Sequence, residues 1–119
     1  MITVKATREG LLGEITSTGY KIDKYVPFVA LPDAHALYEV VRVRANGKQV
    51  LALVMDVGPW NIHDSDYVFG NSRPQAESGT DLYGRKTNGA GIDLSEYVWN
   101  HLDMQDNGNV DWEFVEKGT

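Results

Sequence analysis

The clearest pattern of hydrophobic and polar positions lies in VVRVRANGKQVLALVM, residues 40–55. Valine alternates with arginine before Asn46-Gly47, and such alternation is typical of a strand with one buried face. An Asn-Gly pair suits the two positive-φ positions of a tight hairpin turn. The pattern therefore predicts a hairpin whose second strand runs over residues 49–55.

This second strand is apolar at consecutive positions, since residues 50–54 read VLALV. We expect both faces of such a strand to be covered, as in a barrel or a closed sandwich. Pro59 ends the strand, because proline cannot donate a hydrogen bond to a ladder. The first half of the chain therefore favours a closed β structure.

The second half combines an irregular segment with one helix and a last strand. Residues 61–91 carry five glycines, and a loop of this length is usually functional or mobile. Apolar residues at spacings of four predict a helix over residues 94–102, and Asp93 with Glu96 matches the spacing of a capping box at its start. Residues 110–114 alternate and predict the final strand.

Composition limits the classes of function. The 119 residues, 42% of them hydrophobic, predict one domain over residues 1–119. The net charge of -6 argues against nucleic acid as a partner, because phosphate binding needs a basic patch. No segment is apolar for the roughly 18 residues that a membrane span needs. The absence of cysteine excludes disulfides and thiolate metal sites. We expect the chain to be a monomer and to need no cofactor.

Several short motifs occur in the order GEITSTGY, VALP, the valine-rich hairpin ending in DVGPW, and GIDLSEYVWNHL. This order resembles the double-psi β-barrel domain of the rare lipoprotein A family, whose barrel is shared by expansins and family 45 endoglucanases. The resemblance covers roughly residues 13–60 and 89–115. It implies a mostly β fold, a six-stranded double-psi barrel with one main helix, in which residues 61–91 form a long inserted loop. The chain departs from the family at Val57, where arginine is usual, and in the length of that loop, which we interpret as a lid or an extra wall over a groove.

The resemblance implies that Asp93 is the general acid, because it matches the catalytic aspartate of the family. A carboxyl partly withdrawn from water has a raised pKa and can protonate a glycosidic oxygen. The alternative is that Asp93 only caps the helix. Asp56 either borders the same site or accepts hydrogen bonds from the amides of the turn that follows it. His63 lies near where some transglycosylase members place a histidine; a solvated loop histidine is the other interpretation.

Other residues are candidates for binding a glycan. The aromatic side chains of Tyr20, Trp60 and Tyr67 can stack on sugar faces, although aromatic residues are also ordinary core residues. Arg73 and Arg85 can pair with carboxylates of peptidoglycan, or are solvated loop charges. Thr16 can bind sugar hydroxyls or build the turn before Gly19.

Two further kinds of site are not expected from the sequence. The HDSD segment lacks the glycine and the terminal glutamate of a calcium loop, so we predict no metal site. No second catalytic carboxylate is assigned either, since Glu9, Glu14 and Asp23 match no base of the family.

The sequence leaves three functions open. The first is cleavage of a cell-wall glycan, with peptidoglycan lytic transglycosylation as the leading hypothesis, since that reaction needs only one well-placed carboxyl. The second is a non-catalytic, expansin-like domain that binds or loosens polysaccharide. The third is a barrel reused for protein interaction. The first two predict a periplasmic or extracellular protein if a leader precedes Met1; otherwise the chain stays cytoplasmic until it is released.

Overall fold

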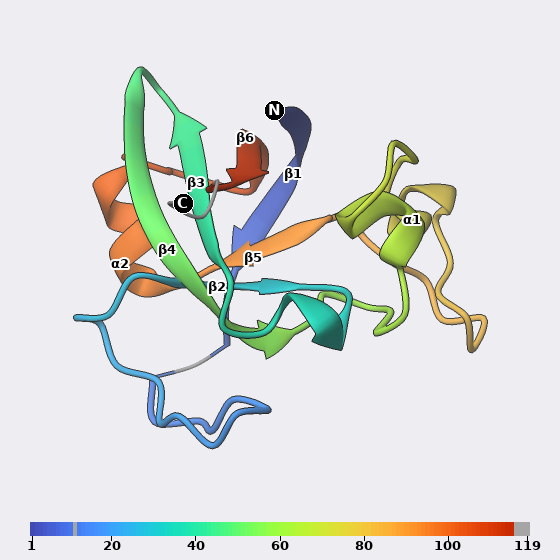
Figure 1. Cartoon of the computed structure of the whole chain (residues 1–119), viewed down its shortest axis with the longest axis horizontal. Helices are drawn as coiled ribbons and strands as arrows, with labels where there is room; N and C mark the ends of the chain where they lie inside the picture. Colours follow the sequence, from blue (N-terminus) through green and yellow to red (C-terminus); the bar gives the residue numbers. More distant parts are fainter. Residues whose placement is uncertain (11, 116–119) are drawn as a thin grey trace.

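The computed structural model describes residues 1–10 and 12–115, and Figure 1 shows their arrangement. In chain order the elements are β1 (Ile2–Arg8), β2 (Phe28–Leu31), the 3-10 turn η1 (Ala34–Ala36), β3 (Val40–Ala45), β4 (Lys48–Val57), α1 (Ser65–Val68), the 3-10 turn η2 (Gln75–Ser78), β5 (Ile92–Leu94), α2 (Glu96–His101) and β6 (Gly108–Phe114). The chain is mostly β, as the sequence predicts.

The six strands close into a barrel in the order β1-β5-β2-β4-β3-β6. Strands β1 and β5 pair in parallel, as do β2 and β4. The other four pairs are antiparallel. Parallel neighbours need long crossover connections, so this order brings segments far apart in the sequence to one end of the barrel. The predicted six-stranded closed barrel is confirmed.

The predicted hairpin is β3 and β4, and its turn has the expected backbone. Asn46 and Gly47 have φ values of 53° and 74°, as a type I′ turn requires. Val41 pairs with Ala52, and Val43 pairs with Val50 across the ladder. The alternation of valine and arginine thus points the valines into the barrel.

The expectation that β4 is covered on both faces is wrong at Leu51, which is 51% exposed. Ala52 and Val54 point inward and are buried. A closed barrel buries only the inner face of a strand, unless a helix or loop covers the outer one. No helix or loop of the described residues covers Leu51, so consecutive apolar residues overstated the burial of this strand.

The predicted helix is present as α2, but it begins at Glu96 rather than at residue 94. Leu94 belongs to β5, and Ser95 is the N-cap, whose side chain accepts a hydrogen bond from the amide of Val98. Asp93 is therefore a strand residue, and the interpretation of Asp93 as the helix cap is wrong. Ser95 caps the helix, because Asp93 lies in β5, where it pairs with β1 and β2.

Inward-facing side chains from all six strands form the core. The fully or nearly fully buried members include Val4, Ala6, Val29, Leu31, Val41, Val43, Ala52, Val54, Ile92, Leu94, Val110 and Trp112. Val98 and Leu102 of the α2 region add to this cluster from outside the barrel wall. The predicted last strand is confirmed as β6, in which Val110 and Trp112 face inward.

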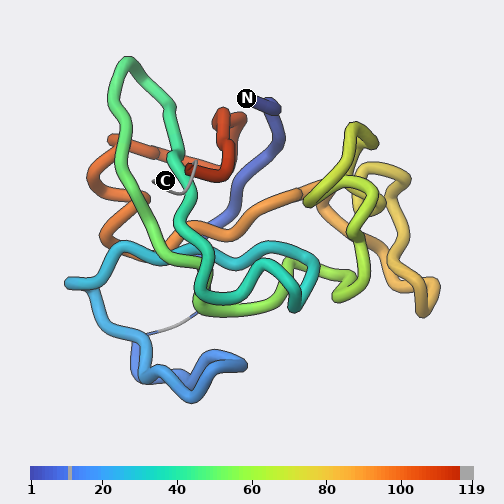
Figure 2. The backbone as a smooth tube through the Cα atoms, in the orientation of Figure 1, coloured from blue at the N-terminus to red at the C-terminus, as the bar shows by residue number. Residues whose placement is uncertain are grey.

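Residues 61–91 form an ordered insert beside the barrel, which the tube in Figure 2 shows as a separate group of turns. The insert contains α1, η2 and a bridge between Thr80 and Lys86. Its own polar side chains fix it, since Asp64 Oδ2 accepts from the amide of Gln75 at 2.8 Å. The predicted loop is thus a small folded unit.

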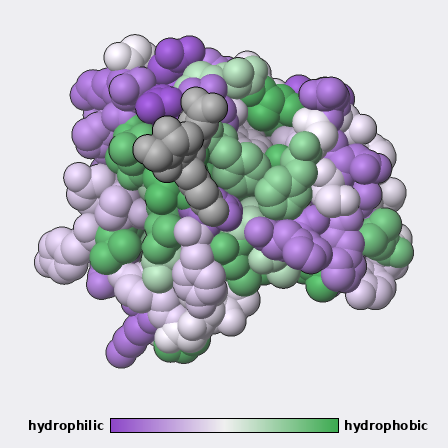
Figure 3. All heavy atoms as spheres, in the orientation of Figure 1, coloured by the Kyte–Doolittle hydropathy of each residue, from purple (hydrophilic) through white to green (hydrophobic). Residues whose placement is uncertain are grey.

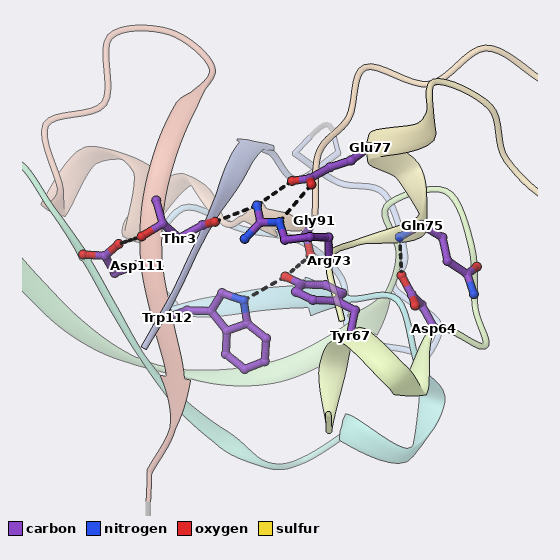
Figure 4. Close-up of polar contacts among 9 residues, drawn as sticks. All are labelled: Thr3, Asp64, Tyr67, Arg73, Gln75, Glu77, Gly91, Asp111 and Trp112. Atoms are coloured by element: carbon purple, nitrogen blue, oxygen red, sulfur yellow. Dashed lines mark hydrogen bonds and ion pairs between the residues drawn. The ribbon is translucent and has the colours of Figure 1, made fainter. Parts of the chain in front are cut away.

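Figure 4 shows how the insert is tied to the barrel. The hydroxyl of Tyr67 donates to the carbonyl of Gly91 at 2.9 Å and accepts from Trp112 Nε1 at 2.8 Å. Arg73 donates to the carbonyl of Thr3 at 2.9 Å and pairs with Glu77 at 2.6 Å. These contacts join α1 and the following turn to strands β1 and β6.

Candidate functional site: a carboxyl cluster beside a groove

Strand register places Asp93 and Asp56 on the same outer face of the barrel. Asp93 pairs with Ala30, and Ala30 pairs with Asp56. The neighbours of Asp93 in β5, Ile92 and Leu94, point into the core, and side chains alternate along a strand. The two aspartates therefore flank Ala30, whose small side chain leaves room between them.

A β-bulge decides the direction of Asp56. Val54 pairs with Val29, but the next pair joins Asp56 to Ala30, so Met55 is the extra residue in β4. Without the bulge, Asp56 would share the inward direction of Val54, two positions before it. The bulge turns the carboxyl out of the core and toward Asp93.

Asp93 is half-buried and held in place by β1. Thr7, its pairing partner in β1, donates a hydrogen bond from Oγ1 to Asp93 Oδ1. Burial raises the pKa of Asp93 to about 6, helped by the charge of Asp56, while hydrogen bonds from Thr7 and Glu9 partly offset the rise. A carboxyl with this pKa is protonated in part of the population near neutral pH and can donate a proton.

The pKa of Asp56 is shifted in the opposite direction from that of Asp93. Burial alone would raise its pKa, but the contact with Glu9 and the amides of Ser17 and Val57 bring the pKa below its ordinary value. Its Oδ1 accepts from Ser17 N at 3.0 Å and from Val57 N at 2.8 Å. Asp56 therefore lies next to Asp93 and also holds the turn at residues 16–19, about forty residues earlier in the chain. Its role is not limited to the Gly-Pro turn that follows it. Asp56, Asp93 and Glu9 together are called the carboxyl cluster.

Glu9 is the member of the cluster that sequence reasoning missed. It directly follows β1, and its amide donates to the carbonyl of Leu94 at 2.7 Å. Because Glu9 lies two positions after Thr7, its side chain points in the same direction and reaches Asp93 and Asp56. Burial, and next the proximity of these two aspartates, raises the pKa of Glu9 to about 10. The matching parity of Thr7 and Glu9 is a signal in the sequence, but its meaning depends on knowing that β1 pairs with β5.

A groove of about 580 Å³ opens beside Asp93. Trp60, which follows the Gly-Pro turn, lies in its wall and donates from Nε1 to Asn88 Oδ1 at 2.9 Å. Other lining residues are Thr7, Arg8, Pro59, Trp99, Gln105, Asp106 and Asn107. The groove thus joins an ionisable carboxyl to an indole ring and to amide side chains, which is a composition suited to a hydroxyl-rich ligand.

Gly58 lies beside Asp93, and its backbone conformation favours glycine. Its φ is 149°, which side-chain-bearing residues rarely adopt, and an added Cβ would lie 3.9 Å from Asp93 Oδ2. The Gly-Pro turn therefore borders the outer carboxyl oxygen of Asp93.

Three residues predicted to bind substrate have structural partners instead. Tyr67 is 1% exposed, with its hydroxyl bonded within the fold, so its ring presents no face to a sugar. Arg73 is paired with Glu77, and Arg85 Nε lies 2.6 Å from Asp81 Oδ2. Neither arginine lines the groove. All three residues thus lie away from the groove beside Asp93, and their roles in binding stay predictions.

The remaining predicted site residues lie outside the groove. His63 is exposed, and its backbone forms an isolated antiparallel β-bridge with the backbone of Asp33, beyond the end of β2. Thr16 is buried and its hydroxyl accepts from the amide of Tyr20 at 3.2 Å, which makes it a turn residue. The ring of Tyr20 packs edge-on against Phe28 at 5.6 Å. Of the predicted binding residues, Trp60 is the one that borders Asp93.

Two features of residues 1–10 and 12–115 bear on metal binding and on the membrane. No group of three His, Cys, Asp or Glu side chains in this part of the chain is arranged to hold a metal ion. No helix there is long and apolar enough to cross a membrane.

On the face shown in Figure 3, hydrophobic residues gather over the middle of the molecule. A second hollow of about 490 Å³ between β6 and α1 is lined by apolar residues such as Ile2, Phe69 and Phe114 and by polar groups that include Asn71 and Glu113.

A family model described as "Domain of unknown function (DUF8814)" matches residues 1–113. The chain belongs to this family. No curated protein matches the chain significantly. Its resemblance to the rare lipoprotein A family therefore remains a likeness of motifs.

Two solved structures show the same fold. The Streptomyces papain inhibitor (SPI) is 21% identical, with a TM-score of 0.55, over 97% of this chain and 94% of that chain. A mutant expansin of Clavibacter michiganensis, in complex with cellohexaose, is 13% identical, with a TM-score of 0.53, over 99% of this chain. This chain spans 52% of the expansin's length. Both likenesses support a barrel of the double-psi type.

Proposed function

We propose that the chain acts on a cell-wall polysaccharide, and that it cleaves peptidoglycan as a lytic transglycosylase with Asp93 as the general acid. The observation that carries the proposal is the position of Asp93, whose carboxyl has a pKa of about 6 and lines a groove beside Trp60. Polysaccharide sites combine such a carboxyl with aromatic stacking surfaces. The likeness of the fold to an expansin bound to cellohexaose supports a glycan as the ligand.

In the proposed reaction, protonated Asp93 donates its proton to the glycosidic oxygen as the bond from that oxygen to the anomeric carbon breaks. A hydroxyl of the same sugar then attacks the anomeric carbon, which closes an internal ring. The proton of that hydroxyl passes to the carboxylate of Asp93, so the acid is regenerated. The proportion of protonated Asp93 falls as the pH rises above about 6, so cleavage weakens there.

Asp56 supports this reaction through its charge. Its carboxylate is ionised, and its repulsion contributes to the raised pKa of Asp93. A fixed negative charge next to the groove also favours the positive charge that develops on the sugar ring in the transition state. Trp60 offers an indole for stacking against a neighbouring sugar. The proposed substrate implies a periplasmic or extracellular site of action.

The decisive experiment is mass spectrometry of purified sacculi incubated with the protein. Anhydro-muramic ends in the products support lytic transglycosylation, whereas reducing ends indicate hydrolysis. Sedimentation with insoluble peptidoglycan, cellulose and chitin is measured in parallel. Binding without product would remove the catalytic role and leave the expansin-like binding function.

A second candidate function is inhibition of a cysteine protease. It is favoured by the likeness to the papain inhibitor, which extends over almost the full length of both chains. The same protein is assayed against papain with a peptide substrate. Inhibition at stoichiometric concentrations, unaffected by Asp93→Asn, would favour a protein-binding barrel over a glycan-cleaving one.

A further inference from the structure

We infer that Glu9 is a neutral positioning residue of this site, whose single carboxyl O–H donates its hydrogen bond toward the two carboxyl groups, Asp56 and Asp93, that flank Ala30. Its role in catalysis rests on the proposed function, whereas its protonation is a property of the folded chain alone. Glu9 precedes all the motifs that carry the family resemblance.

Burial and bonding of the Glu9 side chain provide the first argument. Glu9 is 8% exposed, and its Oε2 is buried without a hydrogen-bond donor among the described residues. An ionised carboxylate in this position would leave a charged oxygen buried and without a donor among the described residues, which is strongly unfavourable. A protonated carboxyl instead becomes a donor, and its neighbours are acceptors.

The groups around Glu9 provide the second argument. Asp56 faces it from β4 and Asp93 from β5, and both are acidic. Arg8, the cation that precedes Glu9 in the chain, pairs with Glu96 Oε2 at 3.2 Å and stacks over Trp99. Among residues 1–10 and 12–115, the groups that act on Glu9 are thus two carboxyls and no cation. Like charges this close cannot all be ionised.

The consequence is a division of protons within the cluster. Burial, with the two aspartates as further causes, raises the pKa of Glu9, so the proton stays on Glu9 at neutral pH. The resulting donor lowers the pKa of Asp56 and limits the rise at Asp93. Glu9 therefore acts through Asp93, by setting the pH at which the acid releases its proton.

The test is a titration of side-chain carboxyl carbons by NMR in the full chain, which needs no substrate. We expect Glu9 to titrate above about pH 8, far from the ordinary value of about 4.3. Glu9→Gln replaces a neutral donor by a neutral donor, so the midpoint of Asp93 should stay within about 0.5 pH units. Glu9→Met keeps the length but removes the donor, so the midpoint of Asp93 should rise by about one unit or more. Glu14→Gln, an exposed control close to Gly10, should leave it unchanged.

Two results would overturn the inference: a Glu9 midpoint near the ordinary value, or a fall of about one unit at Asp93 in Glu9→Gln, which would mean that the wild-type residue carries a charge. Both can be measured even if Glu9→Met does not fold. If the titrations behave as expected but sacculi are not cleaved, the proposed function fails and the protonation of Glu9 stands. Cleavage by a protein whose Glu9 titrates normally would give the reverse conclusion.

Discussion

Asp93 keeps its proton to a higher pH than an ordinary aspartate because it lies in a strand between two others. The raised pKa follows from burial and from the charge of Asp56, whereas the Thr7 hydroxyl fixes its direction. A helix cap would have had the opposite effect, because capping amides stabilise the carboxylate. The same residue type is therefore an acid here because Ser95, rather than Asp93, caps α2.

Asp93→Asn tests the general acid. The amide has nearly the same size and can accept the Thr7 hydrogen bond, but it has no proton to donate at a useful pKa. We expect the variant to fold, to bind peptidoglycan, and to lose cleavage by a factor of about 100 or more. Asp66→Asn, the same change at an exposed position of the insert, is the control. Product release by Asp93→Asn at the wild-type rate would exclude Asp93 from the mechanism.

The cluster also predicts how stability depends on pH. Glu9 and Asp93 have pKa values raised in the folded state, to about 10 and about 6. Between the unfolded and folded pKa the folded state binds more protons, so the free energy of unfolding falls as pH rises. We expect urea midpoints to decrease from about pH 5 toward pH 10, with the contribution of Asp93 complete near pH 7. Glu9→Gln should remove the decrease above about pH 7; an identical slope in wild type and variant would contradict it.

At the scale of elements, the site depends on how strands are aligned rather than on any one motif. The bulge at Met55 turns Asp56 outward, and the short strand β5 places Asp93 between β1 and β2. Ser95 then closes β5 and starts α2. Its hydroxyl accepts from Val98 N and also from Phe28 N at 3.1 Å, so one side chain joins the helix start to strand β2.

Ser95→Ala tests this junction. The change removes the cap and leaves the buried amide of Phe28 without its partner, so we expect a loss of about 1–3 kcal/mol in the free energy of unfolding. The measurement is chemical denaturation, with exposed Ser72→Ala as the control. If the two variants have equal stability, the cap has no energetic role.

At the scale of the whole molecule, the barrel and the insert form the two parts seen in Figure 1. Tyr67 and Arg73 tie the insert to β1, β6 and the segment before β5. The insert in turn supplies Asn88, which holds Trp60 at the groove. Its contribution to the groove is therefore one wall.

Tyr67→Phe measures how firmly the insert is attached. The variant keeps the ring but leaves Trp112 Nε1 and the Gly91 carbonyl without their shared hydroxyl, which should cost about 1–3 kcal/mol. Tyr83→Phe, at a residue that is 82% exposed, is the matched control. Denaturation curves that coincide for these two variants would show that the buried hydroxyl does not anchor the insert.

The sequence by itself determined the features that depend on neighbouring residues. Alternating valines and Asn46-Gly47 predicted the β3–β4 hairpin, and a spacing of four predicted α2, because periodicity and turn chemistry act over a few residues. The motif order indicated a barrel and drew attention to Asp56 and Asp93. Local patterns misplaced the helix cap and overstated the burial of Leu51, because both depend on neighbours in space.

Tertiary structure alone decided which residues share the cluster. Glu9, Asp56 and Asp93 lie far apart in the chain, and they meet because β1 pairs in parallel with β5, while β2 lies between β5 and β4. Their pKa values depend on burial and on each other's charge, which are properties of distance in space and not of order in the sequence. For the same reason the sequence alone could not show the partners that the fold provides for Tyr67, Arg73 and Arg85.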